Sequence, residues 1–190
     1  MRILETTLPG ALLIEPEVFP DDRGFFAETF RAGVLAEAGI TEEFVQDNHS
    51  RSARGVLRGI HFALGEGSSK LVRCGRGRIW DVIVDLRRGS PAYGRWEGFE
   101  LDDENMRVLY VPAGFGHGFC VLSEVADVIY KQSAYYDPAV ESGIAWDDPD
   151  IAVEWPLDEA EALVSERDRA APALAEVADG LPFAWAEAAG

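Results

Sequence analysis

The chain has 190 residues, a length that suits one domain with at most a short extension. Hydrophobic residues make up 47% of the sequence, enough for a core of ordinary size, and the 19 glycines and 10 prolines favour a turn-rich all-β domain over a helical bundle. The formal net charge of −17 at pH 7 disfavours binding to nucleic acid or anionic membranes, so an anionic ligand would need a local group of Arg and Lys.

The cysteines and the N-terminus bear on where the protein works. Cys74 and Cys120 are the only cysteines and neither lies in a Cys-x-x-Cys motif, so we expect two buried free thiols in a reducing compartment. No apolar run approaches the length of a membrane span, and the first residues, MRILETTLPG, lack the apolar core of a signal peptide. The sequence therefore predicts a cytoplasmic protein.

The N-terminal region predicts extended structure followed by one short helix. Residues 11–19 (ALLIEPEVF) indicate a strand interrupted by a proline, residues 21–24 a turn, and residues 25–30 (FFAETF) a second extended segment. Residues 31–40 (RAGVLAEAGI) have the composition and the closing glycine of a short helix.

The central region, from Val45 to Ala134, predicts a succession of strands. Its segments rich in β-branched and aromatic residues are VQDNHS, GVLRGIHF, KLVRCGRGRIWDVIVDLR, WEGFELD, RVLYVPAG, HGFCVLS and ADVIYKQS. Strands this frequent, with tight turns between them, are typical of a sandwich or a barrel. In the segment WDVIVDL, we expect Asp81 and Asp85 to lie on one face.

The C-terminal region is less regular. After Tyr136 the sequence is irregular and acidic, and from about Ser165 it is rich in alanine. We expect a short helix there and a tail that packs on the β domain or is partly frayed at its end. No internal repeat or linker is evident, so we predict a single domain over residues 1–190, with residues 171–190 at its periphery.

One predicted strand carries two polar side chains that need an explanation. Arg58 and His61 interrupt the apolar segment VLRGIHF, and burying either side chain without a partner or a ligand is costly. A regular strand would place them on opposite faces, whereas a β-bulge at Gly59 would turn both into one cavity.

His117 ends a Pro-x-Gly-x-x-His pattern, starting at Pro112, that resembles the second motif of the cupin superfamily of β-barrels. The spacing from Gly55 to His61 fits the first cupin motif, but Ala63 stands where that motif has a second metal-binding His, and no suitably placed Glu follows. Two imidazoles alone make a poor metal site. We therefore expect a cupin-type barrel without a metal, in which a histidine can serve as a base.

The ordered motifs together resemble the dTDP-4-dehydrorhamnose 3,5-epimerase family, whose substrate is dTDP-4-keto-6-deoxyglucose. The similarity runs from about Leu8 to about Pro172. Its motifs are DRGFFAE (22–28), QDNHS (46–50), GVLRGIHF (55–62), KLVR (70–73), DVIVDLR (81–87), GSP (89–91), VPAGFGHGF (111–119), YK (130–131), YY (135–136), WDDP (146–149) and SERD (165–168). The resemblance implies an all-β, cupin-type jelly-roll barrel with short peripheral helices.

The resemblance also implies proton-transfer chemistry. A proton on a carbon next to a ketone is acidic because its loss gives an enolate, and an epimerase removes it from one face and returns a proton to the other. The matching base is His61, and Asp168 is the carboxylate that orients it. Tyr130 matches the acid on the opposite face, and Lys70, with His117 close by, matches the cation at the enolate oxygen. A free imidazole has a pKa of about 6.5 and a phenol of about 10, which suits a base and a protonated donor at neutral pH.

Binding of the nucleotide part follows from the same resemblance. Arg58 and Arg23 match the residues that clamp the diphosphate, a role for which a guanidinium group is suited. The other matching substrate-binding positions are Phe26, Glu28, Gln46, Asn48, His117, Tyr136 and Glu141. In the family, dimerisation carries the N-terminal strand region to the neighbouring site, so we expect a homodimer with strand exchange in which Arg23, Phe26 and Glu28 serve the other subunit.

The sequence departs from the family pattern between Phe62 and Ser69, where an aromatic-Gln pair and a Pro-rich or Gln-containing stretch are common. This leaves open whether C3, C5 or both are inverted: the enzyme is either a full 3,5-epimerase on the way to dTDP-rhamnose, or a C3-only or C5-only epimerase of an antibiotic deoxysugar pathway. The alternatives from other classes are a cupin ketoisomerase and a non-catalytic barrel that binds dTDP-sugars. No redox cofactor is expected, because a proton moves and a hydride does not.

Each candidate residue also has a structural alternative. Tyr130 could be an ordinary strand aromatic, Asp168 a surface carboxylate and Lys70 a plain loop charge. For His49, which follows Asn48 in a polar run, we expect a structural hydrogen-bonding role.

Overall fold

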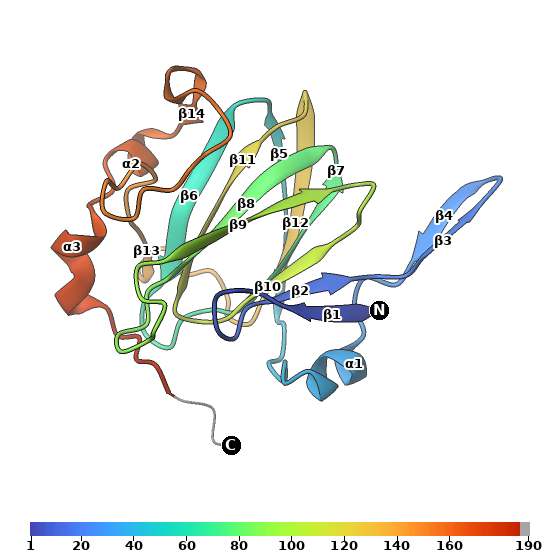
Figure 1. Cartoon of the computed structure of the whole chain (residues 1–190), viewed down its shortest axis with the longest axis horizontal. Helices are drawn as coiled ribbons and strands as arrows, with labels where there is room; N and C mark the ends of the chain where they lie inside the picture. Colours follow the sequence, from blue (N-terminus) through green and yellow to red (C-terminus); the bar gives the residue numbers. More distant parts are fainter. Residues whose placement is uncertain (187–190) are drawn as a thin grey trace.

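Two β-sheets form a jelly-roll barrel in this computed structural model, which describes residues 1–186 (Figure 1). In sheet order, the first sheet consists of β1 (Arg2–Glu5), β2 (Leu12–Glu15), β10 (Val108–Val111), β7 (Lys70–Arg76), β12 (Val125–Gln132) and β5 (Gln46–Ala53). The second consists of β13 (Glu141–Gly143), β6 (Val56–Ala63), β11 (Phe115–Val121), β8 (Arg78–Asp85) and β9 (Trp96–Asp102), with β14 (Leu163–Val164) parallel to β6. The all-β class and the jelly-roll barrel predicted from the sequence are confirmed.

Helices are short and lie at the periphery of the barrel (Figure 1). They are α1 (Ala32–Glu37), α2 (Glu166–Arg169) and α3 (Leu174–Val177), with single 3-10 turns at Glu159–Glu161 and Ala178–Gly180. α1 confirms the helix predicted over residues 31–40, and Gly39 ends it with a φ of +86° that favours glycine. No helix in the described part of the chain is both long and apolar enough to cross a membrane.

A hairpin of β3 (Val18–Asp21) and β4 (Gly24–Ala27) extends away from the barrel (Figure 1). It forms a two-stranded sheet of its own. The hairpin exposes three phenylalanines, Phe19, Phe25 and Phe26, and the last is 68% exposed. Because large apolar side chains are rarely grouped on a free surface, this hairpin is suited to contact another protein surface.

The segment KLVRCGRGRIWDVIVDLR, predicted as one run, is divided into β7 and β8, which belong to different sheets. The division falls at Gly77, whose φ of +76° suits glycine and turns the chain. Its N–H donates to Asp103 Oδ2 at 2.8 Å, which fixes the turn. The run of β-forming residues on both sides of the glycine hid this boundary.

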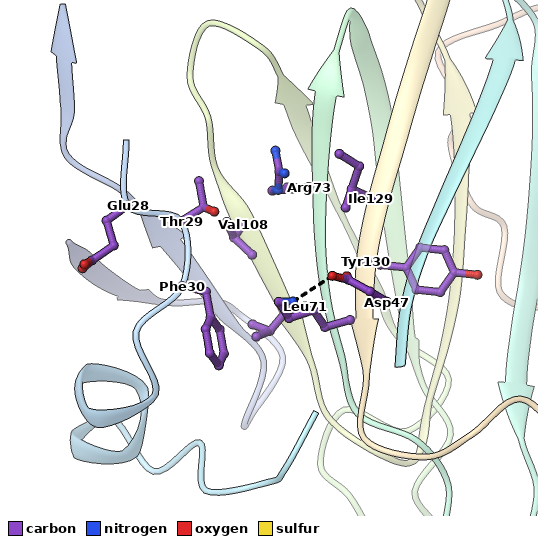
Figure 2. A pocket seen from close by; sticks show the side chains of 10 residues that line it. Glu28, Thr29, Phe30, Asp47, Leu71, Arg73, Val108, Ile129 and Tyr130 are labelled. Atoms are coloured by element: carbon purple, nitrogen blue, oxygen red, sulfur yellow. Dashed lines mark hydrogen bonds and ion pairs between the residues drawn. The ribbon is translucent and has the colours of Figure 1, made fainter. Parts of the chain in front are cut away.

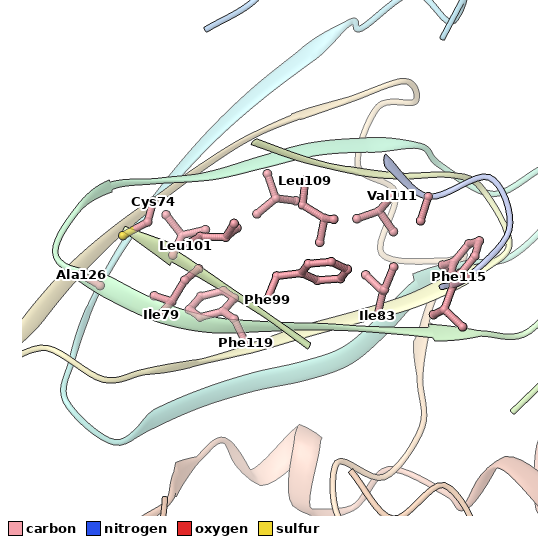
Figure 3. Close-up of a cluster of buried hydrophobic side chains, with 14 of the residues drawn as sticks. Cys74, Ile79, Ile83, Phe99, Leu101, Leu109, Val111, Phe115, Phe119 and Ala126 are labelled. Carbon is pink, nitrogen blue, oxygen red and sulfur yellow. The ribbon is translucent and has the colours of Figure 1, made fainter. Parts of the chain in front are cut away.

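The main core fills the space between the two sheets (Figure 3). It is made of inward-facing apolar residues, which include Cys74, Ile79, Ile83, Phe99, Leu101, Leu109, Val111, Phe115, Phe119 and Ala126. Asp81 and Asp85 alternate with the core residues of β8 on the same inner face, as predicted, and both are fully buried. The two cysteines are free and buried, as expected.

A second apolar cluster packs the C-terminal segment onto the barrel. Its members include Ile60, Phe62, Val82 and Val84 from the second sheet, and Leu174, Leu181 and Phe183 from the C-terminal segment. Asp148 anchors this segment, because its Oδ2 accepts a hydrogen bond from the Leu174 N–H at 2.6 Å. The predicted tail therefore packs on the barrel as far as it is described, and its end, residues 187–190, lies outside the described residues.

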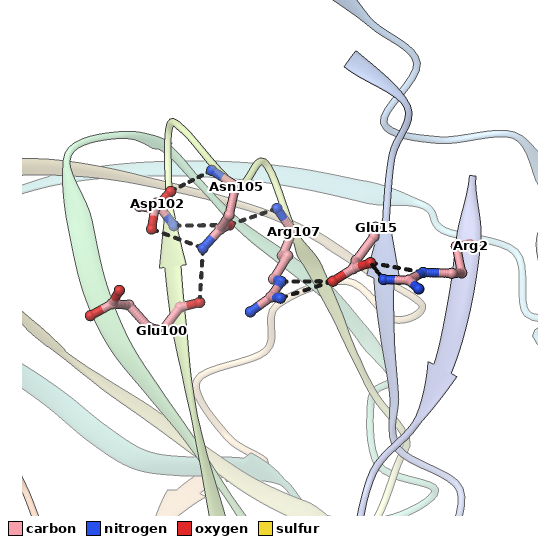
Figure 4. A network of polar contacts seen from close by, with 6 residues as sticks. All are labelled: Arg2, Glu15, Glu100, Asp102, Asn105 and Arg107. Carbon is pink, nitrogen blue, oxygen red and sulfur yellow. Dashed lines mark hydrogen bonds and ion pairs between the residues drawn. The ribbon is translucent and has the colours of Figure 1, made fainter.

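Polar contacts fasten the strand ends on one side of the first sheet (Figure 4). Glu15 on β2 accepts hydrogen bonds from Arg2 on β1 and from Arg107, with Arg107 Nη2 at 2.9 Å, and these bonds hold the pKa of Glu15 below its usual value. Asn105 Nδ2 donates to Asp102 Oδ2 at 2.8 Å within the turn from β9 to β10. Such exposed contacts add little stability, but they fix the order of strands at this edge.

Candidate active site

A β-bulge in β6 brings Arg58 and His61 to one cavity. His117 of β11 pairs with His61, and Phe119 pairs with Arg58, so two steps along β11 correspond to three along β6. Gly59 takes the extra position with a φ of +135°, and a Cβ there would lie 2.5 Å from a Cα of β11. Of the two alternatives for this segment, a regular strand and a strand with a bulge at Gly59, the structure has the bulge.

Asp168 is the hydrogen-bond partner of His61. Its Oδ1 lies 2.6 Å from His61 Nε2, and its Oδ2 accepts a longer bond from the Gly59 N–H at 3.4 Å. The His61 side chain is 26% exposed and the Asp168 side chain 5%. Ser165 Oγ accepts the backbone N–H of Asp168 at 3.1 Å and so caps α2, the short helix that carries this carboxylate.

This pair sets the protonation of the imidazole. A carboxylate only accepts hydrogen bonds, so the proton of the neutral ring is on Nε2 and the lone pair of Nδ1 is left for another group. Burial by itself raises the pKa of Asp168, but the hydrogen bond and the charge of His61 lower it below its usual value. Asp168 is therefore ionised at neutral pH and accepts the hydrogen bond from His61 as a carboxylate.

A second His–Asp pair lies beside the first. His117 is the register partner of His61, and its Nε2 lies 3.0 Å from each carboxylate oxygen of Asp81 on β8. The two side chains are 8% and 0% exposed. Asp81 also acts electrostatically on Lys70, so the buried pair and this lysine are neighbours.

Lys70 begins β7, and its side chain is half-buried. Val72, two residues on, belongs to the core, so Lys70 faces the interior of the barrel. Burial lowers the pKa of Lys70 below its usual value, while the negative charges of Glu141 and Asp81 oppose this shift. The interior thus contains a cation close to two carboxylates.

Tyr130 lies on the inner face of β12, where it packs against the core. Figure 2 shows its ring pointing away from a cavity on the outer face of this sheet. Burial raises the pKa of Tyr130, the charges of Glu141 and Tyr136 raise it further, and Arg58 lowers it. The phenol is therefore protonated at neutral pH, and its hydroxyl shares its surroundings with Arg58 and Glu141.

The inner face of β5 carries a row of polar side chains. Gln46 Nε2 donates to Asn48 Oδ1 at 2.9 Å, and Gln46 Oε1 accepts the Tyr136 N–H at 2.8 Å. Asn48 Nδ2 and Ser50 Oγ are buried and have no hydrogen-bond partner among the described residues. Buried polar atoms are normally paired, so this face is suited to a polar ligand.

Ser50 and Ser52 belong to this row, although they were not among the predicted site residues. Ser52 Oγ lies 3.2 Å from both Nε and Nη2 of Arg58, whose guanidinium is thereby directed along the inner face. The alternation in QDNHSRSA contained the signal, because every second residue of a strand shares a face.

A cavity of about 480 Å³ opens beside His61. Arg58, His61 and Asp168 line it, together with Arg167 and Arg169. Sequence reasoning missed the last two, although both flank Asp168 in the run SERDR. Several guanidinium groups around one cavity can attract an anionic ligand despite the negative net charge of the protein.

The family model described as dTDP-4-dehydrorhamnose 3,5-epimerase matches residues 5–176. The chain belongs to this family. It is therefore an isomerase, an epimerase of the sugar-nucleotide class, and the family predicted from the sequence motifs is confirmed.

Three relatives show how close the similarity is. The dTDP-4-dehydrorhamnose 3,5-epimerase of Methanothermobacter thermautotrophicus is 52% identical over 88% of this chain and 91% of its own length. The dTDP-4-dehydrorhamnose 3-epimerase of Streptomyces niveus is 45% identical over 94% of this chain and 86% of its own length. The crystal structure of the Legionella pneumophila dTDP-6-deoxy-D-glucose-3,5-epimerase, in complex with dTDP-4-keto-L-rhamnose, superposes with a TM-score of 0.93 at 45% identity and covers 97% of this chain and 99% of that chain.

The N-terminal residues predicted to bind substrate do not join the epimerase site within one chain. Arg23 lies at the turn of the β3–β4 hairpin, where its Nη2 is 2.5 Å from Asp21 Oδ2. Phe26 is exposed on the same hairpin, which extends away from the barrel (Figure 1). Glu28 follows the hairpin and pairs with Arg31 at 2.7 Å.

Glu28 lines a different cavity, of about 390 Å³, on the outer face of the first sheet (Figure 2). Its other lining residues come from the segment after the hairpin and from β5, β7, β10 and β12; they are Thr29, Phe30, Asp47, Leu71, Arg73, Val108, Ile129, Tyr130 and Lys131. This cavity lies on the opposite side of the sheet from the Tyr130 ring.

His49 also lies outside the epimerase site. It is exposed on β5, and its Nε2 is 3.6 Å from Asp127 Oδ2. Arg51 Nε binds the other carboxylate oxygen of Asp127 at 2.6 Å, and this bond lowers the pKa of Asp127 to about 2. The position fits the structural role expected for His49.

Among residues 1–186, no cluster of three or more His, Cys, Asp or Glu side chains is placed to hold a metal ion. His61 and His117, the two histidines at the cupin-motif positions, each bind a carboxylate through Nε2. The operation of the site without a metal stays a prediction.

Proposed function

We propose that this chain inverts C3, C5 or both of dTDP-4-keto-6-deoxyglucose by removing and returning a proton through an enolate. The observation that carries the proposal is the His61–Asp168 pair, which uses Nε2 of a partly exposed imidazole beside a cavity and leaves its Nδ1 without a hydrogen bond to any of residues 1–186. Both C3 and C5 flank the C4 ketone, so a proton on either carbon is acidified in the same way. The names of the relatives support this substrate class.

In the first step, His61 Nδ1 takes the proton from the carbon next to the ketone. The electron pair of the C–H bond moves toward the carbonyl, and the oxygen becomes an enolate oxygen. Lys70 supplies positive charge to this oxygen, with His117 nearby, and a charge held in place before reaction is usually the largest electrostatic contribution to catalysis. Asp168 stabilises the imidazolium that forms.

In the second step, the Tyr130 hydroxyl gives a proton to the opposite face of the same carbon. The enolate pair forms the new C–H bond, and the carbonyl is restored. The phenolate then regains a proton from solvent while the imidazolium loses one, so the enzyme returns to its starting state. The raised pKa of Tyr130 supports its role as a protonated donor.

The nucleotide part of the substrate binds beside Arg58 and the row of polar side chains on the inner face of β5. Arg58 and Arg167 hold the diphosphate, a pairing that guanidinium geometry favours. The polar row of Gln46 and Asn48 contacts the pyrimidine, with unpaired Asn48 Nδ2 as a donor to a carbonyl oxygen. Tyr136 and Glu141 complete the wall near Tyr130 and Lys70.

The working form is a homodimer in which the β3–β4 hairpin of each subunit reaches the other. The exposed phenylalanines of the hairpin, and the way it extends away from its own barrel (Figure 1), support this arrangement. Arg23, Phe26 and Glu28 then complete the neighbouring site. We also propose that the protein works in the cytoplasm, which suits two free buried cysteines, and that it uses no cofactor, because the chemistry moves only protons.

A C3-only epimerase of an antibiotic deoxysugar pathway is the second candidate. The Streptomyces niveus relative is a 3-epimerase, and it is nearly as similar to this chain as the 3,5-epimerases are. The loop between Phe62 and Ser69, which departs from the family pattern, joins the strand of His61 to the strand that begins at Lys70. If this loop shifted the sugar ring slightly, a different carbon would face His61.

Heavy water separates the candidates. Wild-type protein is incubated with dTDP-4-keto-6-deoxyglucose in deuterium oxide, and the product is analysed by NMR for deuterium and for stereochemistry. Deuterium with inversion at both C3 and C5 supports a 3,5-epimerase, and deuterium at one carbon supports a single-position enzyme. Binding of dTDP with no exchange above the rate without protein would contradict an epimerase and favour a binding protein.

A further inference from the structure

The loop that leads into Lys70 is held by hydrogen bonds at its two ends, at Leu64 and Ser69, but has little of its own to fix the residues between them. Residues 64–69, the Lys70 loop, join β6 to β7 and contain Gly65 and Gly67 with φ of +74° and +79°. A segment rich in glycine and serine has many unfolded conformations, so packing against the rest of the protein must select one. This is also the stretch in which the sequence departs from the family pattern.

Phe183, in the C-terminal segment, packs on this loop and on the loop that precedes β11. A Cβ placed on Gly67 would lie 3.3 Å from Cε1 of Phe183 and 2.9 Å from Cβ of Ala113. A Cβ placed on Gly114 would lie 3.4 Å from Cβ of Phe183. Phe183 is 7% exposed, and its ring meets that of Phe62 edge-on with 6.0 Å between centroids. One buried ring therefore closes the two loops against each other.

Both loops lead directly to side chains of the candidate active site. The first ends at Ser69, next to Lys70, and the second enters β11, which carries His117. A hydrogen bond joins them, because the Ala113 N–H donates to Ser69 Oγ at 3.1 Å. Gly67 lies two residues before Ser69, and Gly114 directly follows Ala113. Phe183 therefore packs beside both residues that this hydrogen bond joins.

The chain that follows β8 holds Phe183 in place. The Arg88 N–H donates to the Phe183 carbonyl at 3.1 Å, and the Trp185 N–H donates to the Arg88 carbonyl at 2.9 Å. The Arg87 guanidinium lies between two rings, 4.3 Å from the centroid of Phe115 and 4.5 Å from that of Trp185. The segment is thus fixed at both its backbone and its side chains.

We propose that Phe183 is a positioning residue that holds these two loops together and so fixes the Lys70 ammonium relative to the His117–Asp81 pair. The inference rests on the proposed function only in the role of Lys70 at the enolate oxygen. The effect of Phe183 on the position of Lys70 comes from packing and does not depend on that role. It gives a role to a segment beyond residues 5–176, the part that the family model matches.

The chain offers a direct probe, because Lys70 and Lys131 are its only lysines. In protein labelled with carbon-13 at lysine Cε, two NMR signals report the two ammonium groups, and Lys131→Arg assigns them. Burial lowers the pKa of Lys70 from 10.5, against the charges of Glu141 and Asp81, so its titration reports how the side chain is held. Phe183→Ala should move this pKa back toward the usual value and lower kcat about 10-fold with KM nearly unchanged.

Leu174→Ala is the matched control. Leu174 is also 7% exposed and belongs to the same apolar cluster, but it contacts the turn at Gly94, where a Cβ would lie 4.0 Å from its Cδ2. This variant should leave the Lys70 titration and kcat unchanged. Where Phe183→Ala does not fold, Phe183→Leu and Trp185→Ala carry the same test, and Trp185→Phe should keep the wild-type titration.

The outcomes separate this inference from the proposed function. A Lys70 titration equal to wild type in folded Phe183→Ala protein overturns the inference, whether or not kcat falls. A titration that moves while kcat stays constant supports positioning by Phe183 and contradicts the role of Lys70 at the enolate oxygen. A shifted titration together with a lower kcat supports both.

Discussion

Two His–Asp pairs lie side by side in this barrel, and they differ in how the fold assembles them and in how exposed they are. His61 and His117 are register partners on neighbouring strands, and each binds a carboxylate through Nε2, at 2.6 Å and 3.0 Å. Asp81 comes from the adjacent strand, so the sheet itself builds the second pair. Asp168 comes from a helix 107 residues along the chain from His61, so only the packing of the C-terminal segment completes the first pair.

Exposure is the difference that decides their use. The His61 side chain is 26% exposed beside a cavity, whereas the His117 side chain is 8% exposed and its carboxylate is fully buried. A base must reach its substrate before its pKa matters. We therefore expect the open pair to transfer the proton and the closed pair to act as a fixed polar group beside Lys70.

The largest effect should come from the two carboxylates, changed one at a time. Asp168→Asn presents His61 with an amide and no longer fixes its tautomer, so kcat should fall about 10³-fold to 10⁴-fold. Asp81→Asn should lower kcat much less but cost about 3–5 kcal/mol of stability, because it breaks a buried pair. Steady-state kinetics and urea unfolding of both variants test this. Equal losses of kcat would remove the distinction between the pairs.

The next effect concerns the cation beside the closed pair. Lys70→Met keeps the length and apolar stem of the side chain but removes the charge at the enolate oxygen, so kcat should fall about 10²-fold to 10³-fold. Affinity for dTDP, measured by calorimetry, should change little. Lys131→Met is the control, since Lys131 binds Asp47 on the outer face of the sheet. Activity near the wild-type level in the Lys70 variant would contradict its assignment.

A smaller effect should follow from the acid opposite the open pair. Tyr130→Phe removes the proton donor but leaves the base, so epimerisation should slow about 10²-fold while loss of substrate protons to heavy water continues. NMR distinguishes the two processes in one sample. The hydroxyl would have no role in reprotonation if exchange and inversion slowed together.

The smallest effect is a pH dependence of stability. The pKa of Asp168 in the folded protein lies below its usual 3.8, because the hydrogen bond and charge of His61, together with hydrogen bonds from Gly59 and Ser165, outweigh the opposing effect of burial. Its contribution to stability is therefore complete above about pH 4 and is lost as the pH falls through the folded-state pKa. From about pH 4 downward, urea unfolding should show a smaller loss of stability for Asp168→Asn than for wild type.

Local sequence patterns were enough for the parts of the site that lie on one strand. Two polar residues in an apolar segment raised a bulge at Gly59 as one of two alternatives, and frequent short strands indicated a sandwich or a barrel, which the cupin motifs and the family resemblance narrowed to a jelly-roll barrel. The boundary at Gly77 did not, because strand-forming residues continue on both sides of it. A single glycine in such a run does not indicate whether the strand bends there or ends there.

Contacts between distant segments could not be worked out from local patterns. The pairing of Asp168 with His61 was expected only from the family resemblance, because no residue pattern in either segment indicates that the two segments lie together. Arg167 and Ser50 were missed because an arginine or a serine on its own usually lies at the surface, and only the folded chain shows which cavity or face each one lines. Phe183 looked like part of a peripheral tail for the same reason.

The exchange of substrate protons into heavy water by His61→Asn and His117→Asn proteins tests the central claim most directly. We expect exchange in the His61 variant to fall to the rate without enzyme while dTDP still binds, and exchange in the His117 variant to persist at a reduced rate. Rapid exchange by the His61 variant, with none by the His117 variant, would assign the base to the buried pair and contradict this account.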